Sequence, residues 1–229
     1  MSRRAEKLAE VRERIAVAAR RSGRTPDAVR LIAVSKTKPL EDIAALAALG
    51  QRDFGENQMQ EALGKIERLR GRGLEWHFIG HLQSNKTRFI GGHFGWVHSL
   101  DSERLAGRIA ASVRDGDPPV RLLVQVNVFR DPAKHGVASG DVFALLDAIL
   151  ARDLPGIRLC GLMTIARLGA SEADTRLGFA RARALLEQCR ARFGEDFSEL
   201  SMGMSSDYEL AIEEGTTMVR VGSALFGSR

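Results

Sequence analysis

The sequence predicts a single (β/α)8 barrel of the TIM type that carries an extra helix at its N-terminus. Short apolar runs recur along the 229 residues, amphipathic stretches separate them, and about eight strand–helix units can be counted. No long segment rich in Pro, Gly or Ser divides the chain, so we expect one domain over residues 1–229. A doubly wound open sheet is the alternative, because it has the same alternation of strands and helices.

The elements can be placed in order along the chain. Apolar residues repeat with the period of a helix over residues 4–21, which is the extra N-terminal helix. The run LIAVSK at 31–36 is typical of a buried parallel strand, and Pro39 then begins the next helix. Further strands are expected at 52–54, 75–79, 96–98, 120–126, 157–163, 198–201 and 218–221. Further helices are expected at 56–70, 102–114, 139–152, 172–192 and 206–214. The segments 83–92 and 194–200 show little periodicity.

The charge pattern argues against a nucleic-acid-binding protein. The formal net charge is +5, but basic residues are interleaved with acidic ones and form no dense block. Aromatic residues make up 6% of the chain and include a single tyrosine, so surfaces for stacking bases are not expected. A mildly cationic surface suits small phosphorylated ligands better.

The sequence also indicates a cytoplasmic protein that does not enter a membrane. No uninterrupted apolar stretch approaches the roughly 20 residues that a membrane span requires. The first residues lack the apolar centre of a signal peptide, and Glu6, Glu10 and Glu13 are atypical of a transit peptide.

Lys36 is the first candidate for chemistry, because it ends the apolar strand run LIAVS. In a barrel of this type, functional residues lie at the carboxyl ends of the strands. We expect the stem of Lys36 to pack in apolar surroundings, where loss of solvation favours the neutral amine. A neutral amine forms Schiff bases with carbonyl compounds. The alternative is a lysine that extends to solvent from the end of its strand.

Two stretches near the C-terminus are candidates for binding a phosphate group. Residues 200–206 (LSMGMSS) and 219–227 (VRVGSALFG) follow the last two predicted strands. Small and hydroxyl-bearing residues leave backbone N–H groups open and supply side-chain donors. In barrels of this type the loops after strands seven and eight often hold phosphate, although each stretch alone could be a tight turn.

Metal and nucleotide sites are not predicted. His77 and His81 are four residues apart, but they lie in a strand-like segment without the intervening glutamate of a zinc-protease helix. The stretch 222–228 lacks the Gly-Lys-Ser/Thr of a P-loop, and no dinucleotide fingerprint follows any predicted strand. Pyridoxal phosphate, which has an aldehyde and a phosphate, is the simplest ligand for a lysine and a phosphate cradle. A phospho-sugar aldolase would also fit.

The motifs of the chain resemble those of the pyridoxal phosphate homeostasis proteins. The matching segments are AVSKTKP (33–39), FGENQMQE (54–61), WHFIGHLQSNK (76–86), GLMTI (161–165), SMGMSSDYELAIEEG (201–215) and VRVGSALFG (219–227). They span nearly the whole chain in the order of the family. The resemblance implies the fold of the N-terminal barrel of alanine racemase and pyridoxal phosphate as the cofactor.

The resemblance also implies roles for particular residues. Lys36 would carry the cofactor as an internal aldimine, and Arg220 would face its pyridine nitrogen. The remaining assignments are that Ser201, Gly222 and Ser223 hold the phosphate, that Asn57 and Met163 lie near the ring, and that His77, Ser84 and Asn85 line the same mouth.

The chain departs from the family pattern in four places. His81 and Ala166 stand where the family has proline, and Ser223 stands where it has threonine. Phe129, Arg130 and Asp131 replace Ser-Gly-Glu, so the role of their loop is open.

Arg220 and the tyrosine content favour a carrier over an enzyme. A cation beside the pyridine nitrogen disfavours its protonation and so weakens the ring as an electron sink. Racemisation also needs acid–base groups on both faces of the substrate, and the single tyrosine, Tyr208, lies in a predicted helix. We therefore expect no catalytic residues, and a protein that buffers pyridoxal phosphate or delivers it to apo-enzymes. We also expect a monomer, because the chain lacks the second domain that builds the dimer of racemases of this fold. The alternative is a racemase or lyase of the alanine racemase fold.

Overall fold

The computed structural model, which describes residues 3–227, contains a closed barrel of eight parallel strands in the order β1 to β8. The strands are β1 (Arg30–Val34), β2 (Asp53–Glu56), β3 (Glu75–Phe78), β4 (Trp96–Leu100), β5 (Val120–Gln125), β6 (Ile157–Met163), β7 (Glu199–Ser201) and β8 (Met218–Val221). Ile32 of β1 lies opposite Arg220 of β8, which closes the barrel. The predicted (β/α)8 class is confirmed, and the open sheet is wrong.

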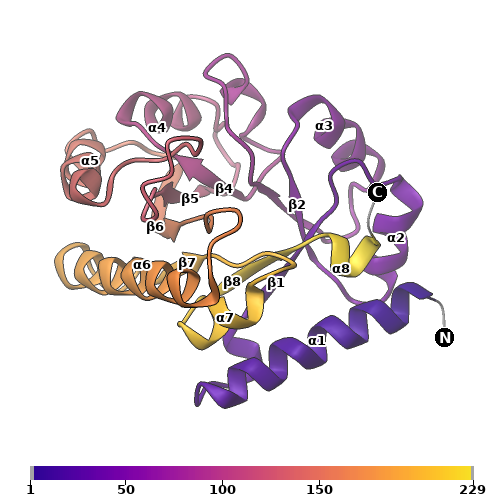
Figure 1. The fold of residues 1–229 in the computed structure, drawn as a ribbon. Helices are drawn as coiled ribbons and strands as arrows, with labels where there is room; N and C mark the ends of the chain where they lie inside the picture. Colours follow the sequence, from indigo (N-terminus) through magenta and orange to yellow (C-terminus); the bar gives the residue numbers. More distant parts are fainter. Residues whose placement is uncertain (1–2, 228–229) are drawn as a thin grey trace.

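Helices surround the barrel, as Figure 1 shows. They are α2 (Leu40–Ala48), α3 (Met59–Arg68), α4 (Glu103–Ala110), α5 (Val142–Leu150), α6 (Glu172–Phe193), α7 (Tyr208–Glu213) and α8 (Ser223–Phe226). Short 3-10 turns are η1 (Pro26–Ala28), η2 (Thr87–Phe89) and η3 (Ser139–Asp141). Between β3 and β4 the chain forms only η2, which agrees with the weak periodicity of residues 83–92.

The extra N-terminal helix is α1 (Arg3–Arg21), and it contacts α2, α7 and α8. Figure 1 shows it running along the outside of the last two units. Its apolar face is buried through Leu8, Val11 and Ile15, as the helical period requires. Arg14 is bonded to Glu209 of α7 at 2.8 Å, which joins the two ends of the chain.

The core is divided into two parts by the barrel wall. Most buried apolar residues lie between strands and helices, whereas a small separate cluster lies inside the barrel. The inner cluster consists of Ile32, Trp96, Leu123, Cys160, Met163 and Met218. Polar side chains of β3, β4, β7 and β8 share the interior, and the carboxyl ends of the strands open above them.

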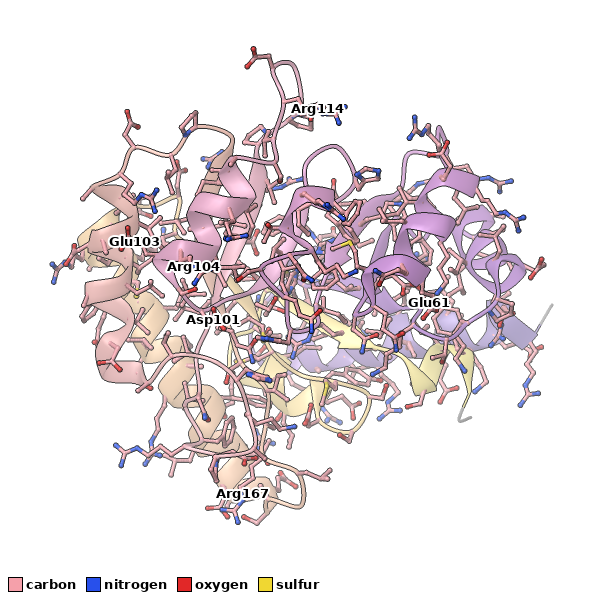
Figure 2. All side chains as sticks on the ribbon, turned by 90° about the horizontal axis from the view of Figure 1, so that it is seen from above. Glu61, Asp101, Glu103, Arg104, Arg114 and Arg167 are labelled. Carbon is pink, nitrogen blue, oxygen red and sulfur yellow. The ribbon has the colours of Figure 1, made fainter. Side chains whose placement is uncertain are left out.

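Charged side chains lie around the outside of the barrel. Figure 2 shows basic and acidic groups interspersed over the surface, with Arg114 and Arg167 at opposite edges. Within residues 3–227, no helix combines the length and apolar character that crossing a membrane requires.

Candidate functional site

A cavity of about 740 Å³ opens at the carboxyl ends of the strands. Loops that follow β1, β2, β3, β5, β6, β7 and β8 all contribute to it. The lining residues are Val34, Lys36, Asn57, Ile79, Gly80, His81, Gln125, Ala133, Lys134, His135, Ile165, Met204, Ser205, Ser206, Arg220, Gly222 and Ser223. This is the end of the barrel at which the sequence predicts a site.

Five of the predicted ligand residues line this cavity together: Lys36, Asn57, Arg220, Gly222 and Ser223. Met163 and Ser201 do not, because each is the last residue of its strand and its side chain is buried deeper in the barrel. Their places on the cavity wall are taken by residues a few positions further along, Ile165 and Ser205.

Three residues predicted at the mouth lie elsewhere. His77 is fully buried inside the barrel, since it belongs to β3 itself and not to the following loop. Ser84 and Asn85 are not among the cavity residues. His81, from the same motif, does line the cavity.

Lys36 lies in a tight turn directly after β1. The turn is closed by a hydrogen bond from the Lys38 N–H to the Ser35 carbonyl at 3.1 Å, and Thr37 has a φ of 60°. Lys36 itself is exposed at the cavity mouth. The expectation that its stem packs in apolar surroundings is therefore wrong, because the strand ends two residues before the lysine.

A buried ion pair supports this turn from below, and the sequence reasoning missed it. The Lys65 ammonium donates to the Ser35 carbonyl and to Glu56 Oε1, each at 2.8 Å, and to Glu61 Oε1 at 2.5 Å. Glu61 in turn accepts from the Thr37 N–H at 2.6 Å. Burial raises the pKa of Glu56, while its bonds to Lys65 and Ser35 act in the opposite direction. The i,i+4 spacing of Glu61 and Lys65 was the available signal.

Arg220 reaches the floor of the cavity from β8. Its Nη1 donates to Ser201 Oγ at 2.7 Å and its Nη2 to the Thr164 carbonyl at 3.0 Å. Burial lowers the pKa of Arg220 to about 10, and Asp207 opposes the shift. Among the residues that the structure describes, no carboxylate forms an ion pair with it. A buried guanidinium with unused N–H groups is suited to a polar ligand atom.

The loops after β7 and β8 form a polar wall. Ser205 Oγ accepts a hydrogen bond from the Gly222 N–H at 3.1 Å, which joins the two loops. Ser205, Ser206 and Ser223 all line the cavity there. Hydroxyl groups gathered at this position can donate to an anionic group such as a phosphate.

Asn57 provides an acceptor that the protein leaves unused. Its Oδ1 is buried and has no hydrogen-bond partner within residues 3–227. Gly80 allows the loop after β3 to approach, since a Cβ at Gly80 would lie 2.5 Å from the Asn57 carbonyl oxygen. A buried acceptor without a partner costs free energy unless a water molecule satisfies it.

Two exposed histidines lie at the mouth and were not predicted. The rings of His81 and His135 stack with centroids 4.1 Å apart and planes 14° apart. His135 and Lys134 belong to the loop after β5, whose role the sequence left open, and this loop therefore reaches the cavity. Phe129 of the same loop packs against Gly178 of α6, where a Cβ would lie 2.1 Å from the ring.

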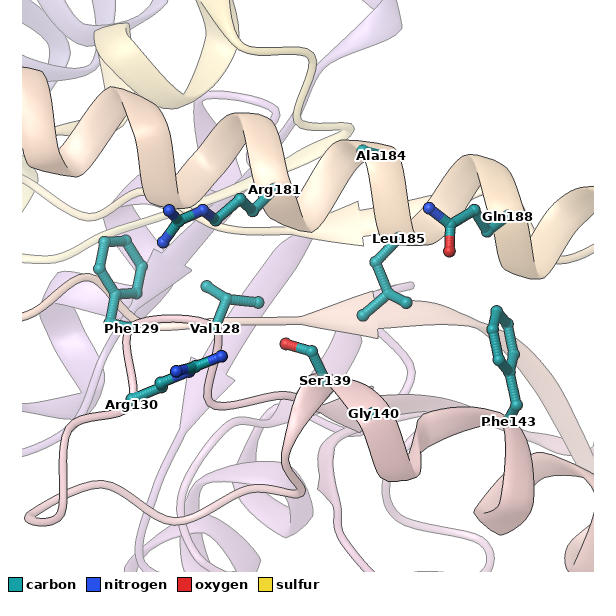
Figure 3. A pocket seen from close by; sticks show the side chains of 10 residues that line it. All are labelled: Val128, Phe129, Arg130, Ser139, Gly140, Phe143, Arg181, Ala184, Leu185 and Gln188. Atoms are coloured by element: carbon teal, nitrogen blue, oxygen red, sulfur yellow. The ribbon is translucent and has the colours of Figure 1, made fainter.

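A second hollow of about 730 Å³ lies outside the barrel, between the start of α5 and the length of α6 (Figure 3). Arg130 and Arg181 face it, but none of the predicted ligand residues does. Residues 3–227 contain no cluster of three or more His, Cys, Asp or Glu side chains that could hold a metal ion.

Comparison with known proteins gives consistent results. Residues 7–229 match the alanine racemase N-terminal domain. The chain is 49% identical over 229 residues to the pyridoxal phosphate homeostasis protein of Pseudomonas aeruginosa, covering 100% of this chain and 97% of the relative. The structure of PipY from Synechococcus elongatus without pyridoxal phosphate has a TM-score of 0.86 and 42% identity, covering 97% of this chain and 99% of PipY. PipY with pyridoxal phosphate bound has a TM-score of 0.80 and 38% identity, covering 98% and 100%.

Proposed function

This chain belongs to the pyridoxal phosphate homeostasis proteins and carries the alanine racemase N-terminal domain, and we propose that it binds pyridoxal phosphate in the cavity at the carboxyl ends of its strands. One observation carries the proposal. The cavity brings together an exposed lysine, three serines and a buried arginine, which match the aldehyde, the phosphate and the ring nitrogen of this cofactor.

Lys36 is the residue that bonds to the cofactor in this proposal. Its Nζ attacks the aldehyde carbon and releases water, which leaves a Schiff base that hydrolysis can reverse. Lys65 and Glu61 hold the backbone of the turn from Ser35 to Thr37, and so they fix the position of the Lys36 backbone from which the side chain extends.

The phosphate is held by the polar wall formed by Ser205, Ser206, Gly222 and Ser223. Ser201, which the resemblance assigned to the phosphate, acts instead through Arg220, because its Oγ accepts from that guanidinium. Asn57, which lines the cavity, lies beside the cofactor ring in this proposal. Met163 supports the floor from within the inner cluster.

We further propose that the protein holds and releases the cofactor, delivering it to apo-enzymes, and does not turn over amino acids. When bound to an enzyme, pyridoxal phosphate supplies an electron sink for carbanions, which is strongest when the ring nitrogen is protonated. Arg220 is a donor and a cation, so it opposes that protonation. Tyr208 does not compensate, since its OH is buried, has no hydrogen-bond partner among residues 3–227 and does not line the cavity. A racemase or lyase remains the competing proposal.

Borohydride labelling tests the binding proposal. The reconstituted protein should show an imine absorption band, and reduction should fix a pyridoxyl group on the peptide that carries Lys36. Lys36→Ala should lose the band and keep measurable affinity, because the phosphate wall is intact. Lys38→Ala is the matched control, because Lys38 lies in the same turn with its Nζ bonded to the Gly227 carbonyl at 3.3 Å. Label on Lys38 or Lys86, or no label, would overturn the assignment.

A further inference from the structure

A continuous chain of hydrogen bonds runs through the barrel interior beneath the cavity. Arg220 Nη1 donates to Ser201 Oγ at 2.7 Å, and Ser201 Oγ lies 2.9 Å from His98 Nδ1. His98 Nε2 lies 3.0 Å from His77 Nδ1, and His77 Nε2 lies 3.0 Å from Asp53 Oδ1. The chain therefore links the cavity floor to the first residue of β2, at the opposite end of the barrel.

The inner members of this chain have no access to water. His77, His98 and Ser201 are fully buried, and Arg220 is 4% exposed. Asp53 is the outer end, with 21% of its side chain exposed and Arg30 Nε at 3.8 Å. The ring of Trp96 stacks on His77 with planes 7° apart and so restricts its rotation. Three polar side chains, His77, His98 and Ser201, are thus held in a row without solvent to exchange partners.

Arg220 and Asp53, at the two ends of the hydrogen-bond chain, determine which group donates and which accepts in every bond between them. An arginine can only donate and an ionised carboxylate can only accept. If both imidazoles are neutral, His77 must carry its proton on Nε2 for Asp53, so its Nδ1 must accept from His98 Nε2. His98 Nδ1 must then accept from the Ser201 hydroxyl. Every bond consequently points from Arg220 toward Asp53.

The environment disfavours protonation of both imidazoles. Burial lowers the pKa of His77, and the hydrogen bond and charge of Asp53 and the charge of Glu75 oppose this while Arg30 adds to it. Burial lowers the pKa of His98 well below its usual range, and His77, Arg220 and Arg30 add to the effect. No carboxylate contacts His98 within the described chain, so an imidazolium there would lie unpaired beside a guanidinium.

We propose that His98, His77 and Asp53 are positioning residues that hold Arg220 toward the ligand through Ser201. The proposal rests on the proposed function, since it assigns what orients the arginine that faces the cofactor ring. The Ser201 proton is committed to His98, so Ser201 can only accept from Arg220. The guanidinium is thereby anchored at Nη1 and at Nη2, where it donates to the Thr164 carbonyl at 3.0 Å. Its remaining N–H groups are left for the cavity.

The first test reads the tautomers and needs no cofactor. Two-bond proton–nitrogen correlation spectra, assigned with His77→Gln and His98→Gln, should show both rings protonated at Nε2 between pH 5 and 8. Protonation of either ring at Nδ1, or a cationic ring within that range, would overturn the proposal.

The second test measures pyridoxal phosphate binding to the whole protein. His98→Leu interrupts the chain of hydrogen bonds, whereas His98→Gln preserves it, because an amide supplies one acceptor and one donor. We expect His98→Leu to weaken cofactor binding by about 2- to 13-fold, the usual range for one lost hydrogen bond. It should also shift the pH midpoint at which the absorption of the bound cofactor changes. His98→Gln should restore both properties.

Asp53→Asn tests the end of the hydrogen-bond chain that lies far from the cavity. It leaves every cavity residue in place, but an amide can donate as well as accept, so the direction of the chain is no longer imposed. We expect it to shift the same midpoint in the same sense as His98→Leu.

The outcomes separate the two proposals. A role limited to stability would lower the melting temperature of His98→Leu and Asp53→Asn and leave the absorption midpoint unmoved, which refutes the positioning role. If the unaltered protein fails to bind pyridoxal phosphate, the proposed function fails, and the tautomer spectra still decide whether the directed chain exists.

Discussion

Replacing Lys65 with methionine removes the ammonium group that partners a buried carboxylate. Lys65 is 8% exposed and Glu56 is 0% exposed, so solvent cannot replace the lost charge. Three hydrogen bonds disappear, to the Ser35 carbonyl, to Glu56 and to Glu61. Methionine has a similar length and no charge, so the change isolates the electrostatic loss.

Removal of one partner from a buried ion pair costs about 3–5 kcal/mol, because the remaining charge is unpaired. We expect Lys65→Met to lower the free energy of unfolding by this amount at pH 7. The assay is urea denaturation followed by circular dichroism. Since globular proteins have a total stability of roughly 5–15 kcal/mol, the loss should be large and measurable.

The effect should depend on pH. Burial raises the pKa of Glu56 above its ordinary value, so the native state binds its proton more tightly than the unfolded chain does. For a carboxyl of this kind, stability falls as pH rises from the unfolded pKa through the folded pKa. Without Lys65 the folded pKa of Glu56 rises further, so the pH range over which stability is lost extends to higher pH. The destabilisation caused by Lys65→Met should therefore shrink as the pH is lowered toward the ordinary pKa of the carboxyl.

Glu56→Gln provides the matched control for this prediction. The double variant Lys65→Met with Glu56→Gln should recover part of the loss, because no unpaired charge is left in the interior. A cost below about 1 kcal/mol, or a cost that does not change with pH, would refute the description of Glu56 and Lys65 as a buried charged pair.

Other substitutions test the cavity and the loop that reaches it. Ser205→Ala should weaken pyridoxal phosphate binding by about 1–3 kcal/mol by equilibrium titration, with the imine band retained; unchanged affinity would remove Ser205 from the phosphate wall. Arg220→Glu should raise deuterium exchange at the α-carbon of alanine in D2O above the unaltered protein; unchanged exchange with the cofactor still bound would mean that a missing second base silences the site. Gly178→Ala should cost about 1–3 kcal/mol in thermal unfolding, because a Cβ would lie 2.1 Å from the Phe129 ring. Phe129→Ala should relieve that cost in the double variant, and additive losses would contradict the contact.

The local pattern of the chain was sufficient for the alternation of strands and helices, but an open sheet has the same alternation, and only the structure shows that the barrel closes. Buried parallel strands need short apolar runs, and the run at 31–36 together with its successors had that character. Weak periodicity at 83–92 corresponded to a segment that forms only η2. The position of Lys36 after the first strand also indicated the end of the barrel at which the cavity lies, because parallel strands place all their carboxyl ends on one face.

The tertiary structure decided which side chains face the cavity and which lie below it. Ser201 and Ser205 are four residues apart in one motif, yet the first points into the barrel and the second lines the cavity. His77 and His81 separate in the same way. A residue in a strand takes its direction from the register and tilt of the closed barrel, whereas a residue in the next loop does not.

Contacts between segments that are distant in the sequence could not be predicted from the sequence either. The stack of His81 on His135 and the chain from Arg220 to Asp53 join residues that come together only when the barrel closes. Sequence periodicity reports the environment of one element at a time, and it carries no information on which element lies opposite. The residue types that suit the site were therefore visible in the sequence, but the hydrogen bonds that orient them exist only in the folded barrel.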